Sequence, residues 1–153
     1  HGVVPYFRSL IYDALISRTT PQREVGIVVG AVTVVDEDAA AARALARREV
    51  ALYLPIVATL DPTVDIEPEL LARLRTAAAR YDFDAAGRLI SDELLTRFAF
   101  AGAPTDLIEQ SVALFDAGAA RVEYGTPHGL SSQQGVELLG ERVLPAVREI
   151  LSA

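Results

Sequence analysis

Two short loops rich in glycine and proline carry the residues of this chain that are best suited to hold a ligand. The first is Gly102-Ala103-Pro104-Thr105, and the second is Gly125-Thr126-Pro127-His128-Gly129. Glycine lets a backbone approach a bound group closely, and the N–H groups that open a following helix can bind phosphate. Thr126 adds a hydroxyl, and His128 adds ring nitrogens that can donate a hydrogen bond or transfer a proton. We therefore predict a ligand-binding role for these loops, beside the alternatives of plain strand-to-helix turns and a surface histidine.

Other polar groups of the chain have a structural explanation beside a functional one. Asp36-Glu37-Asp38 places three carboxylates before a predicted helix, where they could hold a cation or cap the helix. Glu123 lies between apolar neighbours and is either a polar contact inside the fold or the partner of an arginine. Arg121 cannot be that partner by direct strand pairing alone. Ser131 and Ser132 could contact a ligand or cap a helix, and no Ser-His-Asp set, Walker loop or metal-spaced histidine cluster is present, so no metal is predicted.

The two loops follow apolar segments that are typical of parallel strands. Val25–Val35 is β-branched and apolar at nearly every position, which predicts a strand covered by helices on both faces. Arg97–Ala101 and Ala120–Gly125 are the next predicted strands, and the helix Pro104–Ala117 forms the crossover between them. Because parallel sheets carry their binding groups on the loops after the strands, we expect both loops to lie on one rim of the sheet.

The remaining segments are mostly predicted helices. Gly2–Tyr6 is predicted to be the end of a further strand, and Arg8–Arg18 a helix that Thr19-Thr20-Pro21 terminates. Three strands, or four with Gly2–Tyr6, form either a small open sheet or about half of an eight-stranded barrel. Without a repeat or a linker, residues 1–153 are predicted to form a single domain. The other predicted helices are Ala39–Ala58 interrupted or bent at Pro55, Glu69–Arg80, Ala85–Leu95, and Ser131–Leu151 kinked at Pro145.

The composition narrows the classes of function. A net charge of −7 argues against a nucleic-acid-binding surface. No apolar run approaches the roughly 20 residues that span a bilayer, and the start of the chain lacks a leader pattern. The absence of cysteine excludes disulfides and thiolate sites and fits a cytoplasmic protein. The absence of methionine indicates a processed chain or part of a longer one, and a hydrophobic content of 51% predicts a dense core or an interface, as in a homo-oligomer.

Four segments carry a resemblance to a known family. They are VVGAVTVVDEDAAAARALAR at 28–47, FAFAGAPTDLIEQ at 98–110, LFDAGAARVEYGTPHG at 114–129 and GVELLGERVLPAVRE at 135–149. In their order and spacing they resemble the bacterial-luciferase-like superfamily, specifically its methylenetetrahydromethanopterin-reductase-like branch. The resemblance covers most of the chain from about Val25 onward.

This resemblance implies an α/β fold that is about half of a (β/α)8 TIM barrel, from strand 5 or 6 to strand 8, with Gly2–Tyr6 as the tail of the fifth strand. Members of the family bind coenzyme F420, a deazaflavin, or FMN at the strand ends. They transfer hydride to or from a small substrate, or act as monooxygenases. The resemblance assigns cofactor contacts to Gly102, Ala103 and Gly125–Gly129, including Thr126, Pro127 and His128, and makes His128 a candidate catalytic residue.

Three interpretations stay open at this point. The first is the C-terminal part of an F420-dependent or FMN-dependent oxidoreductase, with F420 preferred because the match is to the reductase branch. The second is a non-catalytic half-barrel that associates with itself or with a partner chain. The third is a piece of a longer enzyme whose N-terminal half supplies much of the substrate pocket.

Overall fold

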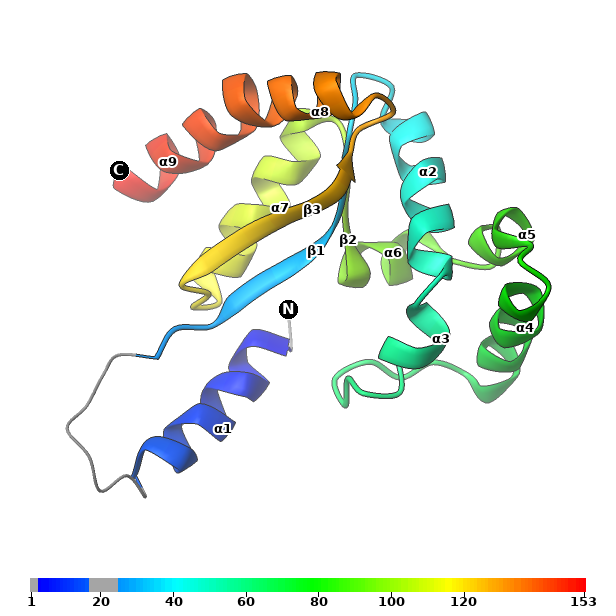
Figure 1. The fold of residues 1–153 in the computed structure, drawn as a ribbon. Coiled ribbons are helices and arrows are strands. Elements are labelled where there is room, and N and C mark those ends of the chain that lie inside the picture. Colours follow the sequence, from blue (N-terminus) through cyan, green and yellow to red (C-terminus); the bar gives the residue numbers. More distant parts are fainter. Residues whose placement is uncertain (1–2, 17–24) are drawn as a thin grey trace.

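Three parallel strands form the centre of the molecule, with helices packed on both faces (Figure 1). The structure is a computed structural model and describes residues 3–16 and 25–153. The strands are β1 (Val28–Val35), β2 (Ala99–Gly102) and β3 (Arg121–His128). The order across the sheet is β2-β1-β3, and both pairs are parallel. The predicted α/β class, with parallel strands alternating with helices, is confirmed.

Helices make up most of the remaining described residues. A long helical connection joins β1 to β2, and one helix crosses from β2 to β3. Among the described residues, none of the helices combines the length and the apolar character needed to cross a bilayer. The helices are α1 (Val3–Ile16), α2 (Ala39–Ala51), α3 (Leu54–Val57), α4 (Pro68–Ala79), α5 (Phe83–Gly87), α6 (Asp92–Phe98), α7 (Pro104–Asp116), α8 (Ser132–Leu138), the π-helical turn η1 (Leu139–Val143) and α9 (Leu144–Ser152).

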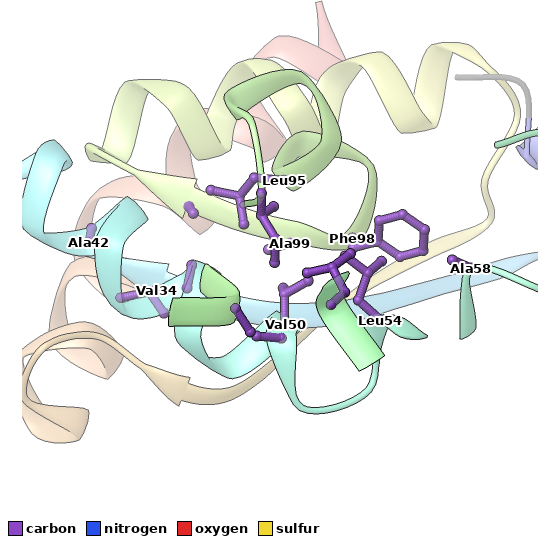
Figure 2. Packing of buried hydrophobic residues seen from close by; sticks show 14 residues of the cluster. Val34, Ala42, Val50, Leu54, Ala58, Leu95, Phe98 and Ala99 are labelled. Carbon is purple, nitrogen blue, oxygen red and sulfur yellow. The ribbon is translucent and has the colours of Figure 1, made fainter. Parts of the chain in front are cut away.

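Two hydrophobic clusters cover the two faces of the sheet. Successive residues of a strand point to opposite faces, so Val34 and Val35 enter different clusters. Val34 and Ala99 pack with residues of α2, α3 and α6, including Leu54 (Figure 2). On the other face, Val35 and Phe100 pack with apolar residues of α7, η1 and α9. The sheet is therefore sandwiched where the three strands end.

The beginning of β1 is not covered in this way. Val28 is 51% exposed and Gly30 is also exposed, whereas Thr33, Val34 and Val35 are buried. The prediction that the whole segment is covered on both faces is therefore wrong for its first half. The reason is that α2 returns along the C-terminal half of β1 and leaves the N-terminal half open on that face.

The predicted strand at the N-terminus is wrong for the residues that the structure describes. Val3–Tyr6 form the first part of α1, and Gly2 and Thr19-Thr20-Pro21 lie outside the described residues. The apolar run continues at helical spacing into Leu10 and Ile11, so a helix can bury Val4 against the sheet's outer layer.

Proline and capping residues set the helix boundaries of the β1–β2 connection. The predicted interruption at Pro55 is confirmed, since α2 ends at Ala51 and Pro55 lies in the first turn of α3. The predicted helix at 69–80 is α4. The predicted helix at 85–95 is two helices, because the side chains of Asp82 and Ser91 accept backbone N–H groups and start α5 and α6 separately. The α6 helix runs to Phe98, so β2 begins later than predicted and ends at Gly102.

The closing helix departs from regular geometry before the predicted proline kink. The irregularity is η1, and Pro145 lies in the first turn of α9. Proline has no N–H to donate to the carbonyl of Glu141 four residues earlier, so the preceding turn can widen to the π form.

Candidate functional site

The C-terminal ends of the three strands form one edge of the sheet, which we call the rim. It consists of the loops Asp36–Asp38, Gly102–Thr105 and Gly125–Ser131. Val35 pairs with Gly102, and Val34 pairs with His128. The N–H of Asp36 donates to the carbonyl of Gly102 at 3.1 Å. The structure therefore brings the two predicted loops together at the same end of the sheet.

β3 continues further into the predicted loop than expected. Gly125 is paired with Val32, and the strand runs to His128, with a register shift opposite Val32–Val34. A Cβ on Gly125 would lie 2.7 Å from the carbonyl oxygen of Ala31, so only glycine permits this approach. The prediction that the strand ends at Gly125 is wrong, because a bulge extends the pairing by three residues.

His128 has an unusual backbone and an unpartnered ring nitrogen. Its φ is +80°, in the left-handed region that non-glycine residues rarely adopt, and a cis peptide bond joins Thr126 to Pro127 just before it. The ring is half-buried, and its Nδ1 is buried without a hydrogen-bond partner among the described residues. A buried polar atom without a partner is destabilising by about 1–3 kcal/mol. Nδ1 therefore keeps a hydrogen-bonding capacity that none of the described residues uses.

The start of α8 packs closely against the end of β3. A Cβ on Gly129 would lie 2.8 Å from the Cα of Gly135 and 2.9 Å from the carbonyl oxygen of Val35. A Cβ on Gly135 would lie 2.6 Å from the N of Gly129 and would also meet the carbonyl of His128. These two glycines hold the first turn of α8 directly against the backbone of His128.

The loop after β2 already uses its polar groups inside the protein. The Asp106 carboxylate accepts the N–H of Ala103 at 2.8 Å and pairs with Arg43 at 2.9 Å. Gly102 has a φ of +140°, and a side chain there would meet Asp106. Pro104 lies in the first turn of α7, as predicted. A carboxylate, paired with Arg43, thus lies at this loop, and the N–H of Ala103 is already hydrogen-bonded and not available to a ligand.

The loop after β1 is also explained by local structure. Asp38 accepts the N–H groups of Ala40 and Ala41, which confirms the capping interpretation. Asp36 is buried and accepts the N–H of Asp38 at 3.0 Å, and Glu37 pairs with Arg142. Within residues 3–16 and 25–153, no group of three or more metal-ligating side chains converges.

The loop after β3 differs from the other two. Ser131 occupies the N-cap position of α8, but its side chain makes no capping hydrogen bond, and the first turn contains no acidic residue. The prediction that Ser131 or Ser132 is the cap is confirmed for the position of Ser131, but the side-chain hydrogen bond expected of a cap is not formed. Of the three helices that follow the rim loops, α8 is the one with neither a side-chain cap nor an acidic residue in its first turn.

Two polar contacts near the rim were not predicted from the sequence. The ion pair between Arg43 and Asp106 joins residues 63 positions apart, and no local pattern signals it. The Tyr124 hydroxyl lies 2.7 Å from that of Ser111. Burial raises the pKa of Tyr124, and the hydrogen bond with Ser111 acts in the opposite direction. Tyr124 thus supports β3 from the α7 side and does not face a ligand.

Glu123 lies away from the rim, near the beginning of β3. It forms an ion pair with Arg121, its neighbour two residues earlier. The expectation excluded Arg121 as a partner by direct strand pairing alone, and the observed pair forms within one strand, where residues i and i+2 lie on the same face. Both side chains are exposed, opposite Gly30 and Val28 of β1.

Comparisons with known proteins agree with this geometry. No family model matches the chain. A 5,10-methylenetetrahydromethanopterin reductase of Archaeoglobus fulgidus is 30% identical over 122 residues, which are 74% of this chain and 36% of the relative. The enzyme of the same name from Methanopyrus kandleri is 29% identical over 84 residues, which are 55% of this chain and 24% of that protein.

A solved structure has the same fold. It is the coenzyme F420 dependent tetrahydromethanopterin reductase from Methanopyrus kandleri, which matches with a TM-score of 0.67 at 24% identity over 78% of this chain and 35% of its own. This chain therefore spans about a third of the length of the proteins it matches.

The fold is a parallel α/β sheet whose strands end at one edge, and it matches part of a solved reductase. The comparisons support a partial chain of the luciferase-like family, in the branch of the methylenetetrahydromethanopterin reductases.

Proposed function

We propose that this chain is part of an F420-dependent oxidoreductase and that the loop after β3 holds the cofactor's phosphate and one edge of its ring. FMN is the alternative cofactor, and a small molecule such as a pterin is the proposed substrate class. The observation that carries the proposal is the combination in one loop of an uncapped helix start and an unpartnered buried nitrogen, the Nδ1 of His128. The proposed setting is the cytoplasm.

The residues present fit a phosphorylated, flat cofactor. The first-turn N–H groups of α8 can donate hydrogen bonds to phosphate oxygens, since no acidic side chain competes there. Gly129 and Gly135 keep this turn against the backbone of His128, so both groups can meet one ligand. Thr126 is exposed on the same loop and adds a hydroxyl. In contrast, the amide of Ala103 is occupied by Asp106, so in the loop after β2 Gly102 remains the proposed contact.

When bound, F420 supplies the hydride chemistry. The part assigned to this chain is to bind and orient the cofactor, with His128 holding a hydrogen bond to a polar atom of the ring or phosphate. We also propose His128 as a candidate catalytic residue that donates a proton. This role requires its imidazole ring to face the substrate.

Cofactor binding tests the proposal directly. We expect the protein to bind F420 more tightly than FMN in fluorescence or calorimetric titrations. The exchange His128→Ala should weaken F420 binding about tenfold, because one hydrogen bond to a buried polar atom is removed. Thr105→Ala, in the rim loop after β2 and also exposed, is the matched control and should leave the affinity unchanged. Binding of neither cofactor would contradict the proposal, and tighter binding of FMN would reverse the order of the two cofactors.

A second candidate function is a half-barrel that associates with itself or with a partner chain. Two observations favour it. β2 pairs with β1 only along Val32–Val35, so Val28–Ala31 have no strand partner on that edge among the described residues. In addition, α1 exposes a row of large apolar side chains, namely Tyr6, Phe7, Leu10, Tyr12 and Ile16. Open strand edges and apolar patches of this kind are normally covered in folded proteins.

Light scattering, which measures the mass of the particle in solution, tests whether the protein associates with itself. If the open edge is an interface, the protein should be a dimer or larger at micromolar concentration. Val28→Lys should then shift it toward the monomer, since a charge on an edge strand opposes pairing. Leu60→Lys, at an exposed apolar residue outside the sheet, is the control and should not. A monomer that binds no apolar dye would count against this candidate.

A further inference from the structure

The arginines of α4 and α5 differ from the other arginines of the β1–β2 connection. On α2, each arginine has an acidic partner: Arg43, Arg47 and Arg48 pair with Asp106, Asp92 and Asp84. Among the described residues, the arginines on α4 and at the two helix ends beside it form no ion pair. These unpaired arginines are Arg73, Arg75, Arg80 and Arg88.

Three of the unpaired arginines surround a groove between α4 and α5. The groove has a volume of about 560 Å³, and Arg73, Arg80 and Arg88 line it. Two carboxylates, Glu69 and Asp82, also line it. The Asp82 carboxylate caps α5, because one of its oxygens accepts a hydrogen bond from the N–H of Ala85 at 2.9 Å. The groove is thus lined by three arginines and two carboxylates in a chain whose net charge is −7, and its volume lies in the range of small-molecule pockets.

An exposed aromatic residue lies in the short connection between α4 and α5, next in sequence to two residues that line the groove. Tyr81 lies between the lining residues Arg80 and Asp82 and is 82% exposed. Its φ is +57°, at the position after a helix where glycine is strongly preferred. Its ring meets Phe83 edge-on, with the centroids 6.1 Å apart. This edge-on contact is the ring contact recorded for Tyr81 among the described residues, and the ring stays largely exposed, so a flat ligand could stack on it.

We infer that the α4–α5 groove binds a nucleoside monophosphate, with the phosphate among Arg73, Arg80 and Arg88 and the base against Tyr81. Guanidinium groups bind phosphate oxygens in pairs, and an aromatic face accepts any base. A single nucleotide is favoured over a nucleic acid, because the acidic chain as a whole repels a long polyanion. In Figure 1, α4 and α5 lie apart from the strand ends, so the site is separate from the rim and independent of the proposed function.

Calorimetric titration of the protein with adenosine monophosphate, adenosine and pyrophosphate tests the inference. Adenosine monophosphate should bind at least tenfold more tightly than either of the other two probes. Arg88→Gln should weaken its binding about tenfold. Arg75→Gln is the matched control, since Arg75 is an unpaired arginine of α4 that does not line the groove.

A further variant separates the role of the ring from folding. Tyr81→Gly removes the aromatic face and relieves the positive φ, so the protein should fold normally and bind adenosine monophosphate several-fold more weakly. Equal losses in the Arg75 and Arg88 variants would overturn the inference, as would no binding. Pyrophosphate binding as tightly as adenosine monophosphate would reduce the site to a phosphate site and overturn the nucleoside assignment. Cofactor binding at the rim should be unchanged in all three variants.

Discussion

Replacing Gly135 with alanine is expected to destabilise the protein by about 3 kcal/mol, at the upper end of the cost of overpacking. The added Cβ would meet the backbone of His128 and would lie 2.6 Å from the N of Gly129. These are main-chain atoms, so they cannot turn away as a flexible side chain would. The first turn of α8 must therefore move off β3. Urea unfolding measures the loss of stability, and F420 titration of the folded fraction should show weakened binding if the loop after β3 is the cofactor site.

Gly140 provides the matched control for this exchange. It lies in the same C-terminal helical region, in η1, and a Cβ there would have no neighbour within 4 Å. Gly140→Ala should raise stability by about 0.5–1 kcal/mol, because alanine loses less backbone freedom in a helix. Equal effects at the two positions would show that the close packing of Gly135 against His128 does not determine the shape of the rim.

Replacing Leu54 with alanine should have a comparably large effect, a loss of about 2–5 kcal/mol. Leu54 is 0% exposed and lies at the start of α3, within the cluster that joins the helical layer to Val34 and Ala99 (Figure 2). Its removal would leave a cavity, because the helix break at Pro55 prevents this segment from sliding inward. Thermal or urea unfolding measures the change.

Ile56, two residues further along the same short helix, is the control for the exchange at Leu54. It is 67% exposed, so Ile56→Ala should change stability by no more than about 0.5 kcal/mol. Below the unfolding transition, both variants should bind cofactor normally, since neither residue belongs to the rim. If Leu54→Ala lowered the free energy of unfolding no more than Ile56→Ala, the packing around Leu54 would not be what stabilises the position of α3.

Local chemistry made several features of the fold predictable. The β-branched run before Asp36 predicts a strand, which the structure contains and buries at its C-terminal end, and a strand followed by a helix occurs again around Gly102. The proline at position 55 fixes a helix boundary because it lacks an N–H, whatever its surroundings. Each of these features depends on residues close together in the chain. That is why the α/β class and the rim with both glycine-containing loops were predicted correctly.

Features that depend on distant residues were not predictable. Val3–Tyr6 has an apolar pattern compatible with a strand or a helix, and its packing beside Val35 and Leu107 decides for the helix. The strand end at Gly125 was placed too early, because the bulge requires the neighbouring backbone of Ala31. The Arg121–Glu123 pair, in contrast, forms within one strand and could have been inferred from strand periodicity.

The linear order of residue types was thus enough to predict a parallel α/β fold with both glycine-containing loops on one edge, since periodicity and turn chemistry act over a few residues. The cap of α2 by Asp38 is also a local feature, whereas only the folded arrangement brings Arg43 to Asp106. Asp106 occupies the amide of Ala103 together with Arg43, and Asp38 caps α2, while the start of α8 has no such side chain. Hydrogen bonds between segments 60 residues apart follow from three-dimensional packing, and no short-range pattern encodes them.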